Sequence, residues 1–113
     1  MHIDSYSFGK IIIDGKTYTS DVIIYPDRVD ASWWRKEGHY LQKADLKDVV
    51  ESSPEVLVIG TGSMGVMTVP KDTVAFLQAK GIEVHVEKSG KAVEAFNSLT
   101  ATRRVVGAFH LTC

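Results

Sequence analysis

Residues 55–59 constrain the fold more than any other part of the chain. Every position after the first is apolar, and the run is rich in β-branched side chains. Such a run is typical of a strand covered on both faces, usually in the middle of a parallel sheet. It passes directly into Gly60-Thr61-Gly62-Ser63-Met64-Gly65, whose G-x-G-x-x-G spacing is that of dinucleotide-binding folds.

The rest of the second half alternates helix and strand. Pro70 suits the first turn of a helix, and Gly81 suits the left-handed position just past its end. A strand over 82–86 follows, and Ser89 is placed to cap a third helix. A last strand covers 105–111. This order predicts a largely parallel or mixed sheet built from a βαβαβ unit.

The N-terminal third is expected to be β-rich. Asp14-Gly15 tolerates the positive φ of a tight hairpin turn between two apolar segments. Strands are predicted over residues 7–13, 16–18, 21–25 and 29–34. Together they are expected to form a small antiparallel meander with one buried face.

A short helix is predicted between these two parts. It covers 44–51, with Asp45 as its cap and a proline after its end. The length of 113 residues is enough for one core, so we expect a single α/β domain over residues 1–113.

The glycine loop has two interpretations. In the dinucleotide fingerprint the glycines open the helix, so that phosphate rests on free N–H groups at its N-terminus. Here the helix cannot sensibly begin before Val69 or Pro70, which makes the loop too long for that geometry. The favoured interpretation is a wide turn whose glycines permit close backbone packing. The alternative is a ligand or small anion held by the loop, with these candidate residues: Gly60, Thr61, Gly62, Ser63 and Gly65.

Trp33, Trp34 and Arg35 form an unusual aromatic and basic cluster. On a strand, the two tryptophans point to opposite faces, so one is expected to pack inward and the other to be exposed. An exposed tryptophan beside an arginine resembles a protein-contact hot spot. The other interpretation is that both tryptophans are core or rim packing.

Composition excludes several classes of function. The formal net charge of −1 implies no general affinity for nucleic acid or anionic membrane. No apolar run approaches the roughly 18 residues that span a bilayer, and the first residues do not resemble a signal peptide. The single cysteine is consistent with a reducing cytoplasm. No metal site and no cofactor are predicted.

Two weaker constellations involve histidine. His85 and Glu87 share a strand face, but no third metal ligand lies at a recognisable spacing. His110 and Cys113 have the residue types of a base and a nucleophile. A chain end is usually mobile, so that interpretation requires residue 113 to be docked onto the body.

Several short motifs occur in a specific order along the chain. They are Tyr25-Pro26, Trp34-Arg35, Leu57-Val58-Ile59-Gly60-x-Gly62, Val69-Pro70, Gly81-Ile82-x-Val84, Asn97-x-Leu99 and Phe109-His110-x-Thr112-Cys113. In this order the chain resembles a family of small domains of unknown function. That family includes the animal adipogenesis-associated protein and a methanogen structural-genomics protein. The mitochondrial complex I assembly factor three is a more distant member.

The resemblance implies a three-layer α/β fold with a mixed central sheet and a small added β portion. It supplies no catalytic residues. We therefore expect a non-catalytic interaction or assembly module that uses the Trp33–Arg35 region or a sheet edge to hold a protein partner or a second copy. The alternative is a binding protein for a small ligand or nucleotide-type anion at the glycine loop, which leaves enzymatic activity open.

Overall fold

The central strand of the molecule is β6 (Val56–Thr61), and all six of its residues are buried. The computed structural model describes residues 1–113. β6 pairs in parallel with β7 (Glu83–Glu87) on one side and with β8 (Val105–His110) on the other. The apolar run after residue 55 therefore forms the buried parallel strand that the sequence predicts.

Two sheets make up the β structure. β4 (Val22–Ile24) runs antiparallel to β8, and β5 (Val29–Asp30) runs antiparallel to β4. The main sheet is therefore mixed, with strand order β5-β4-β8-β6-β7. A separate antiparallel sheet contains β1 (Ile3–Ser7), β2 (Lys10–Ile13) and β3 (Lys16–Tyr18). The expected mixed central sheet and small antiparallel portion are both confirmed.

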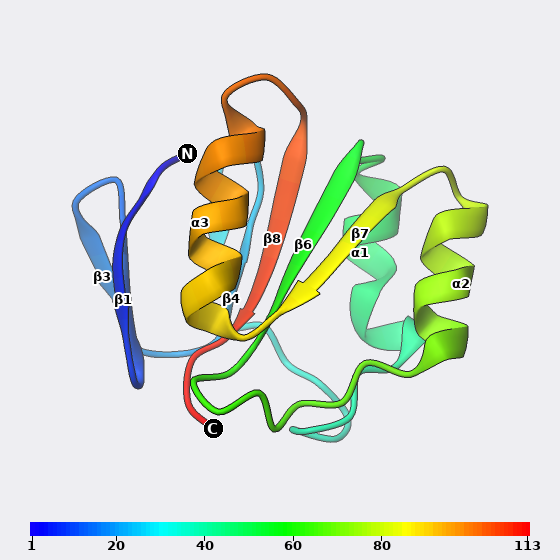
Figure 1. The fold of residues 1–113 in the computed structure, drawn as a ribbon, viewed down its shortest axis with the longest axis horizontal. Helices are drawn as coiled ribbons and strands as arrows, with labels where there is room; N and C mark the ends of the chain where they lie inside the picture. The colour runs from blue at the N-terminus through cyan, green and yellow to red at the C-terminus, as the bar shows by residue number, and fades with distance from the viewer.

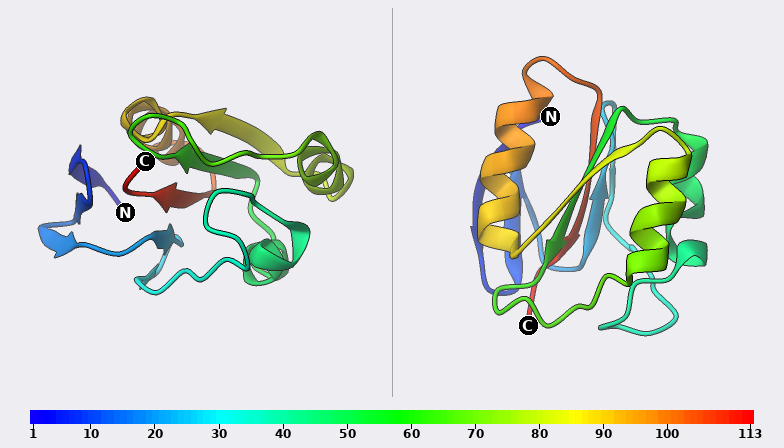
Figure 2. Two further views of the ribbon diagram at one scale, coloured as in Figure 1. Left: turned by 90° about the horizontal axis from the view of Figure 1, so that it is seen from below. Right: turned by 45° about the vertical axis from the view of Figure 1, so that its right-hand side comes forward.

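The helices lie on both faces of the main sheet. α3 (Ser89–Thr100) and the small sheet lie on one face (Figure 1). The short 3-10 helix η1 (Lys43–Leu46), α1 (Lys47–Glu51) and α2 (Lys71–Ala79) lie on the other, so the fold has three layers (Figure 2). None of these helices combines the length and the apolar composition that a bilayer crossing requires.

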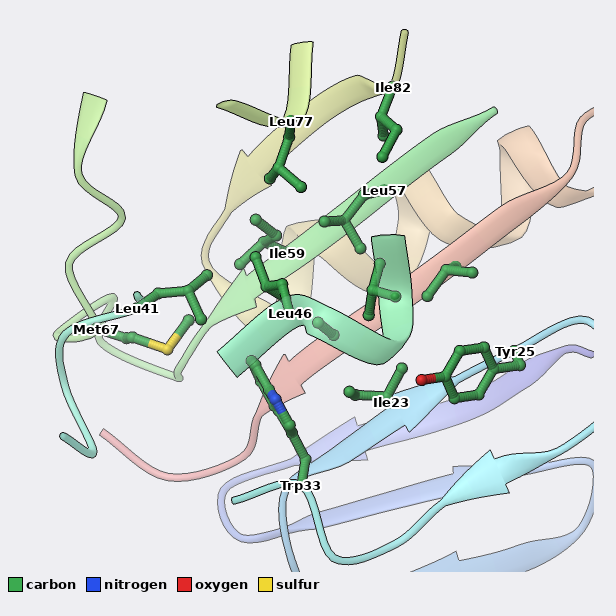
Figure 3. Close-up of a cluster of buried hydrophobic side chains, with 13 residues drawn as sticks. Ile23, Tyr25, Trp33, Leu41, Leu46, Leu57, Ile59, Met67, Leu77 and Ile82 are labelled. Atoms are coloured by element: carbon green, nitrogen blue, oxygen red, sulfur yellow. The ribbon is translucent and has the colours of Figure 1, made fainter. Parts of the chain in front are cut away.

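Alternation along β6 divides the interior into two cores. Val56 and Val58 face α3 and the small sheet, in a cluster of 12 buried residues. Leu57 and Ile59 face α1 and α2, in a cluster of 13 buried residues (Figure 3). Because both faces of the strand are covered by apolar layers, a continuous apolar run is favoured over an alternating one.

The start of α2 is where the sequence places it. Pro70 is the N-cap with φ −61°, and Lys71 is the first helical residue. Gly81 follows the helix with φ +80°. The connection after β6 runs through α2 on one face, and the connection after β7 runs through α3 on the other. The carboxyl ends of β6 and β7 therefore form a topological switch point, where α/β sheets usually bind ligands.

The N-terminal third departs from the expected meander. Residues 7–13 are not one strand, because a turn at Phe8-Gly9 divides β1 from β2, with Gly9 at φ +76°. The segment after residue 21 leaves the small sheet and joins the main sheet as β4. The predicted strand over 29–34 is also too long: only Val29–Asp30 pairs with β4.

Two local helix predictions require correction. The segment 44–51 is a 3-10 turn followed by one short α-helix, and the Asp45 carboxylate accepts from the Gln42 amide at 2.8 Å from inside the 3-10 turn. The N-cap of α3 is Lys88, with Ser89 as the first helical residue. The Ser89 hydroxyl is instead used in a tertiary contact with β8, so it does not cap the helix.

Candidate functional site

The glycine loop crosses the switch point at the carboxyl end of β6. Gly62 and Gly65 adopt φ values of +105° and +71°, which side-chain-bearing residues rarely adopt. Five residues separate Gly65 from the first residue of α2. The amides at the N-terminus of α2 therefore lie beyond the glycines in sequence, and the loop does not have the dinucleotide-binding arrangement.

Two amides of the loop, and the amide of the residue that follows it, bond to the chain segment after β8. The amide of Ser63 donates to the main-chain oxygen of Thr112 at 2.7 Å. The amides of Met64 and Val66 both donate to the main-chain oxygen of Cys113, at 3.3 and 3.0 Å. We call residues 111–113 the post-β8 segment; its last two residues, Thr112 and Cys113, are docked onto the glycine loop.

Close packing explains why glycine is required beside this segment. A Cβ at Gly62 would overlap the main-chain carbonyl of Cys113 and lie 2.8 Å from the His110 ring. The Gly62 amide donates to the Ser89 hydroxyl at 2.9 Å, and that hydroxyl donates to the His110 carbonyl oxygen at 2.6 Å. The start of α3, the glycine loop and the end of β8 are thus joined around one serine.

A buried ionic cluster lies next to this junction. The Asp21 carboxylate accepts from Arg35 Nη2 at 2.7 Å and from His110 Nδ1 at 2.8 Å. Its other oxygen accepts from the Leu111 amide at 2.8 Å. His110 Nδ1 also lies 3.2 Å from Arg35 Nη2. Both nitrogens donate to the same Asp21 oxygen, so this short distance is a contact between two donors and not a hydrogen bond between them.

The electrostatic consequence falls on Asp21. Burial raises the pKa of this carboxyl, but the hydrogen bonds from His110, the Leu111 amide and Arg35 outweigh burial and lower the pKa to about 2. Asp21 is therefore ionised throughout the physiological range and holds β8 and residue 35 to the start of β4.

Arg35 anchors the segment between β5 and η1. Its side chain is only 5% exposed. Nε and Nη2 both donate to the Gly38 carbonyl oxygen, at 3.1 and 2.9 Å, and the guanidinium lies 4.5 Å from the Trp33 ring centroid. Nη1 is buried without a hydrogen-bond partner. The charge of Arg35 is thus directed into the protein.

The three residues of the aromatic and basic cluster differ in how far they are buried. Counting backbone and side chain together, Trp33 is 7% exposed and Arg35 is 9% exposed, whereas Trp34 is 75% exposed. Trp33 also donates from its indole nitrogen to the Asp45 carbonyl oxygen at 3.2 Å. Trp33 packs inward and Trp34 outward as expected, although a loop and not a strand places them there.

A carboxylate–imidazole–hydroxyl arrangement leads from the cluster toward the surface. Thr112 Oγ1 lies 3.5 Å from His110 Nε2, and His110 Nδ1 is bonded to Asp21. These are the residue types of a relay that activates a nucleophile. The distance between the hydroxyl and the imidazole is at the long limit for a hydrogen bond. The four surface grooves of the molecule are lined by other residues, so no groove opens onto this hydroxyl. Cys113 is exposed.

Sequence reasoning missed Asp21, which lies 89 positions from His110. One signal was available: a lone carboxylate directly before a buried apolar strand is unusual, and a buried charge requires a partner. His39 was also missed, and its ring meets that of His110 edge-on with centroids 5.3 Å apart.

Comparison with solved structures identifies the fold. A conserved hypothetical protein of Pyrococcus horikoshii, PH1505, is 25% identical, covers 100% of both chains and has a TM-score of 0.85. The protein MT938 is 25% identical, with coverage of 99% of this chain and 98% of its own and a TM-score of 0.83.

A curated relative adds a more distant connection. NADH dehydrogenase [ubiquinone] 1 alpha subcomplex assembly factor 3 of Xenopus tropicalis is 29% identical over 112 residues. The match covers 96% of this chain and 59% of the assembly factor, so the chain spans little more than half of that protein.

The family follows from a match along nearly the whole chain. Residues 3–110 match the family model described as "Protein of unknown function (DUF498/DUF598)". The resemblance based on the ordered motifs is thereby confirmed, and the chain belongs to the DUF498/DUF598 family.

Proposed function

We propose that the chain is a non-catalytic protein-interaction module whose contact surface centres on Trp34. The observation that carries the proposal is that Trp34 is 75% exposed as a residue between two buried neighbours. Tryptophan is enriched among the few interface residues that supply most of the binding free energy. A tryptophan left in water on a rigid segment is therefore a candidate anchor.

The segment that carries Trp34 is fixed on both sides. Trp33 is held by its indole hydrogen bond to the Asp45 carbonyl oxygen, and Arg35 by its ion pair with Asp21 at 2.7 Å. Fixing the backbone before binding reduces the conformational entropy lost on association. The buried residues of the cluster thus contribute by presenting Trp34.

A groove of about 370 Å³ lies beside the exposed indole. Ile23 and Trp33 contribute apolar surface to it, and charged residues of both signs, including Lys47 and Asp48, contribute to its lining. An apolar centre with a polar rim is the usual layout of a protein–protein contact. The printed name of the Xenopus relative, an assembly factor, also supports a role in binding other proteins.

Affinity capture with a matched control tests this surface. Trp34→Ala is compared with Phe8→Ala, because Phe8 is another exposed aromatic residue, 61% exposed on the β1–β2 turn. Partners captured by the wild type and by Phe8→Ala are expected to be lost with Trp34→Ala. Loss of a hot spot costs about 2 kcal/mol or more, or roughly a 30-fold weaker dissociation constant for a purified partner.

Equal capture by Trp34→Ala and wild type would remove the proposed surface. Sedimentation over a range of protein concentrations distinguishes the kind of partner. Self-association that Trp34→Ala abolishes would identify a second copy of the chain, and a monomer at all concentrations would leave a heterologous partner.

A further inference from the structure

The post-β8 segment, Leu111–Cys113, occupies the place where α/β sheets usually hold a ligand. The carboxyl ends of β6 and β7 lie there, and the connections after these strands diverge to opposite faces. Figure 1 shows the C-terminus beside the loop that follows β6. The occupant of the switch point is thus a part of the chain itself.

The contacts to this segment resemble those made to an oxygen ligand. Two amides, of Met64 and Val66, converge on the single main-chain oxygen of Cys113, and the Ser63 amide donates to Thr112. Backbone amides that converge on one oxygen in a glycine-containing turn form a concavity of the kind that binds anions, although the Gly65 amide between these two donates to the Gly62 carbonyl oxygen.

The charge around the loop is also suited to an anion. The side chain of Lys88 lies against Gly65, where a Cβ would be 3.1 Å from the Lys88 Cγ. α3 begins at the next residue, and its first-turn amides at Gly90 and Lys91 have no acceptor inside the helix. The acidic residue adjacent to this turn in sequence is Glu87, which is exposed.

The segment is attached in a way that allows it to detach. Leu111 is 1% exposed and forms a firm anchor. Beyond it, Thr112 and Cys113 have exposed side chains and are held mainly through their main-chain oxygens, apart from the 3.5 Å approach of Thr112 Oγ1 to His110. Few buried apolar contacts therefore oppose the release of these two residues.

The geometry points to a latent oxyanion site at Ser63–Val66, covered by residues 112 and 113 until a phosphate-like anion displaces them. The inference is independent of the Trp34 surface. A covered site binds with an affinity reduced by the fraction of molecules that are open. Removing the cover is therefore expected to strengthen binding, because the amides that would contact the anion become free.

The test measures anion binding to a variant that ends at Leu111. Sodium pyrophosphate is titrated into the wild type and the shortened variant at constant ionic strength, and backbone amide shifts are followed by NMR. We expect saturable shifts at the amides of Ser63, Met64 and Val66, with an apparent dissociation constant about tenfold or more lower in the variant. Absence of saturable shifts in the variant, or equal binding by both proteins, would overturn the inference.

Three further variants keep the test decisive. The double variant Thr112→Gly/Cys113→Gly retains the chain length, places no new carboxyl group near the site and loosens the cover through backbone entropy. It is expected to bind pyrophosphate more tightly than the wild type, and unchanged binding would count against the cover. In the shortened chain, Lys88→Ala is expected to weaken binding, whereas Lys10→Ala, on the separate small sheet, is not. Equal effects of the two lysines would indicate only general charge attraction.

Discussion

Replacing Asp21 by asparagine tests whether the buried ionic cluster stabilises the fold. The change removes the carboxylate that pairs with Arg35 and accepts from His110 Nδ1, and it leaves a guanidinium that is 5% exposed without a counter-charge. Removing one member of a buried ion pair costs about 3–5 kcal/mol. Because the Asp21 side chain keeps 18% of its exposure, we expect the lower end of this range, about 3 kcal/mol, in the free energy of unfolding at pH 7.

The pH dependence of stability gives an independent magnitude. The pKa of Asp21 falls from 3.8 to about 2 in the folded protein. At 1.36 kcal/mol per pKa unit this corresponds to about 2.5 kcal/mol, which solvent screening reduces to about 1–2 kcal/mol. A lowered carboxyl pKa means that the unfolded chain binds more protons, so this stability is present above about pH 4 and is lost as the pH falls toward 2.

The assay is urea unfolding followed by tryptophan fluorescence at several pH values between 7 and 2. Asp27→Asn is the matched control, because Asp27 pairs with Arg28 at 3.0 Å but has a side chain that is 76% exposed. The control is expected to lie within about 0.5 kcal/mol of the wild type, as exposed pairs contribute little. If Asp21→Asn matched the control at pH 7 and kept the acid dependence of the wild type, the cluster would not have the role assigned to it.

Three other substitutions, two of them with a matched control, test packing in different parts of the fold. Trp33→Ala is expected to lower the unfolding free energy by about 3–5 kcal/mol, whereas Trp34→Ala should change it by less than about 0.5 kcal/mol, both measured by urea unfolding. Gly60→Ala would place a Cβ 2.7 Å from a buried aromatic ring and should cost about 1–3 kcal/mol in thermal unfolding; Gly90→Ala, which meets nothing within 4 Å, should be neutral or stabilising. Asn97→Ala removes hydrogen bonds of 2.9 and 2.8 Å to the first strand, and faster amide exchange in β1–β3 should accompany a loss of about 1–3 kcal/mol.

The second half of the chain was predictable because its signals are local. The apolar run that forms β6 identifies a strand covered on both faces without reference to any distant residue. Pro70 and Gly81 mark the limits of α2 through their own backbone preferences. In the first part Asp14-Gly15 marks the turn between β2 and β3, but the turn at Gly9 lies inside what reads as one strand.

The ionic cluster was not predictable from local patterns. Asp21, Arg35 and His110 come from three separate segments, and the main-sheet pairing of β4 with β8 brings two of them together. That pairing was itself misassigned, because a strand after a hairpin ordinarily continues the meander. A meander that keeps residues 21–25 in the small sheet separates Asp21 from His110, so the sequence pattern offers the carboxylate no partner.

The glycine spacing shows why a motif can be correct about geometry and misleading about function. In dinucleotide-binding folds, glycines are needed because the backbone must approach a pyrophosphate closely. Here Gly60 allows close approach of the Phe109 ring, and Gly62 allows close approach of the main chain at Cys113. The spacing therefore indicates that another group packs closely against the backbone at the carboxyl end of β6. In this protein the path of the chain after β8 makes that group the protein's own main chain and not a bound nucleotide.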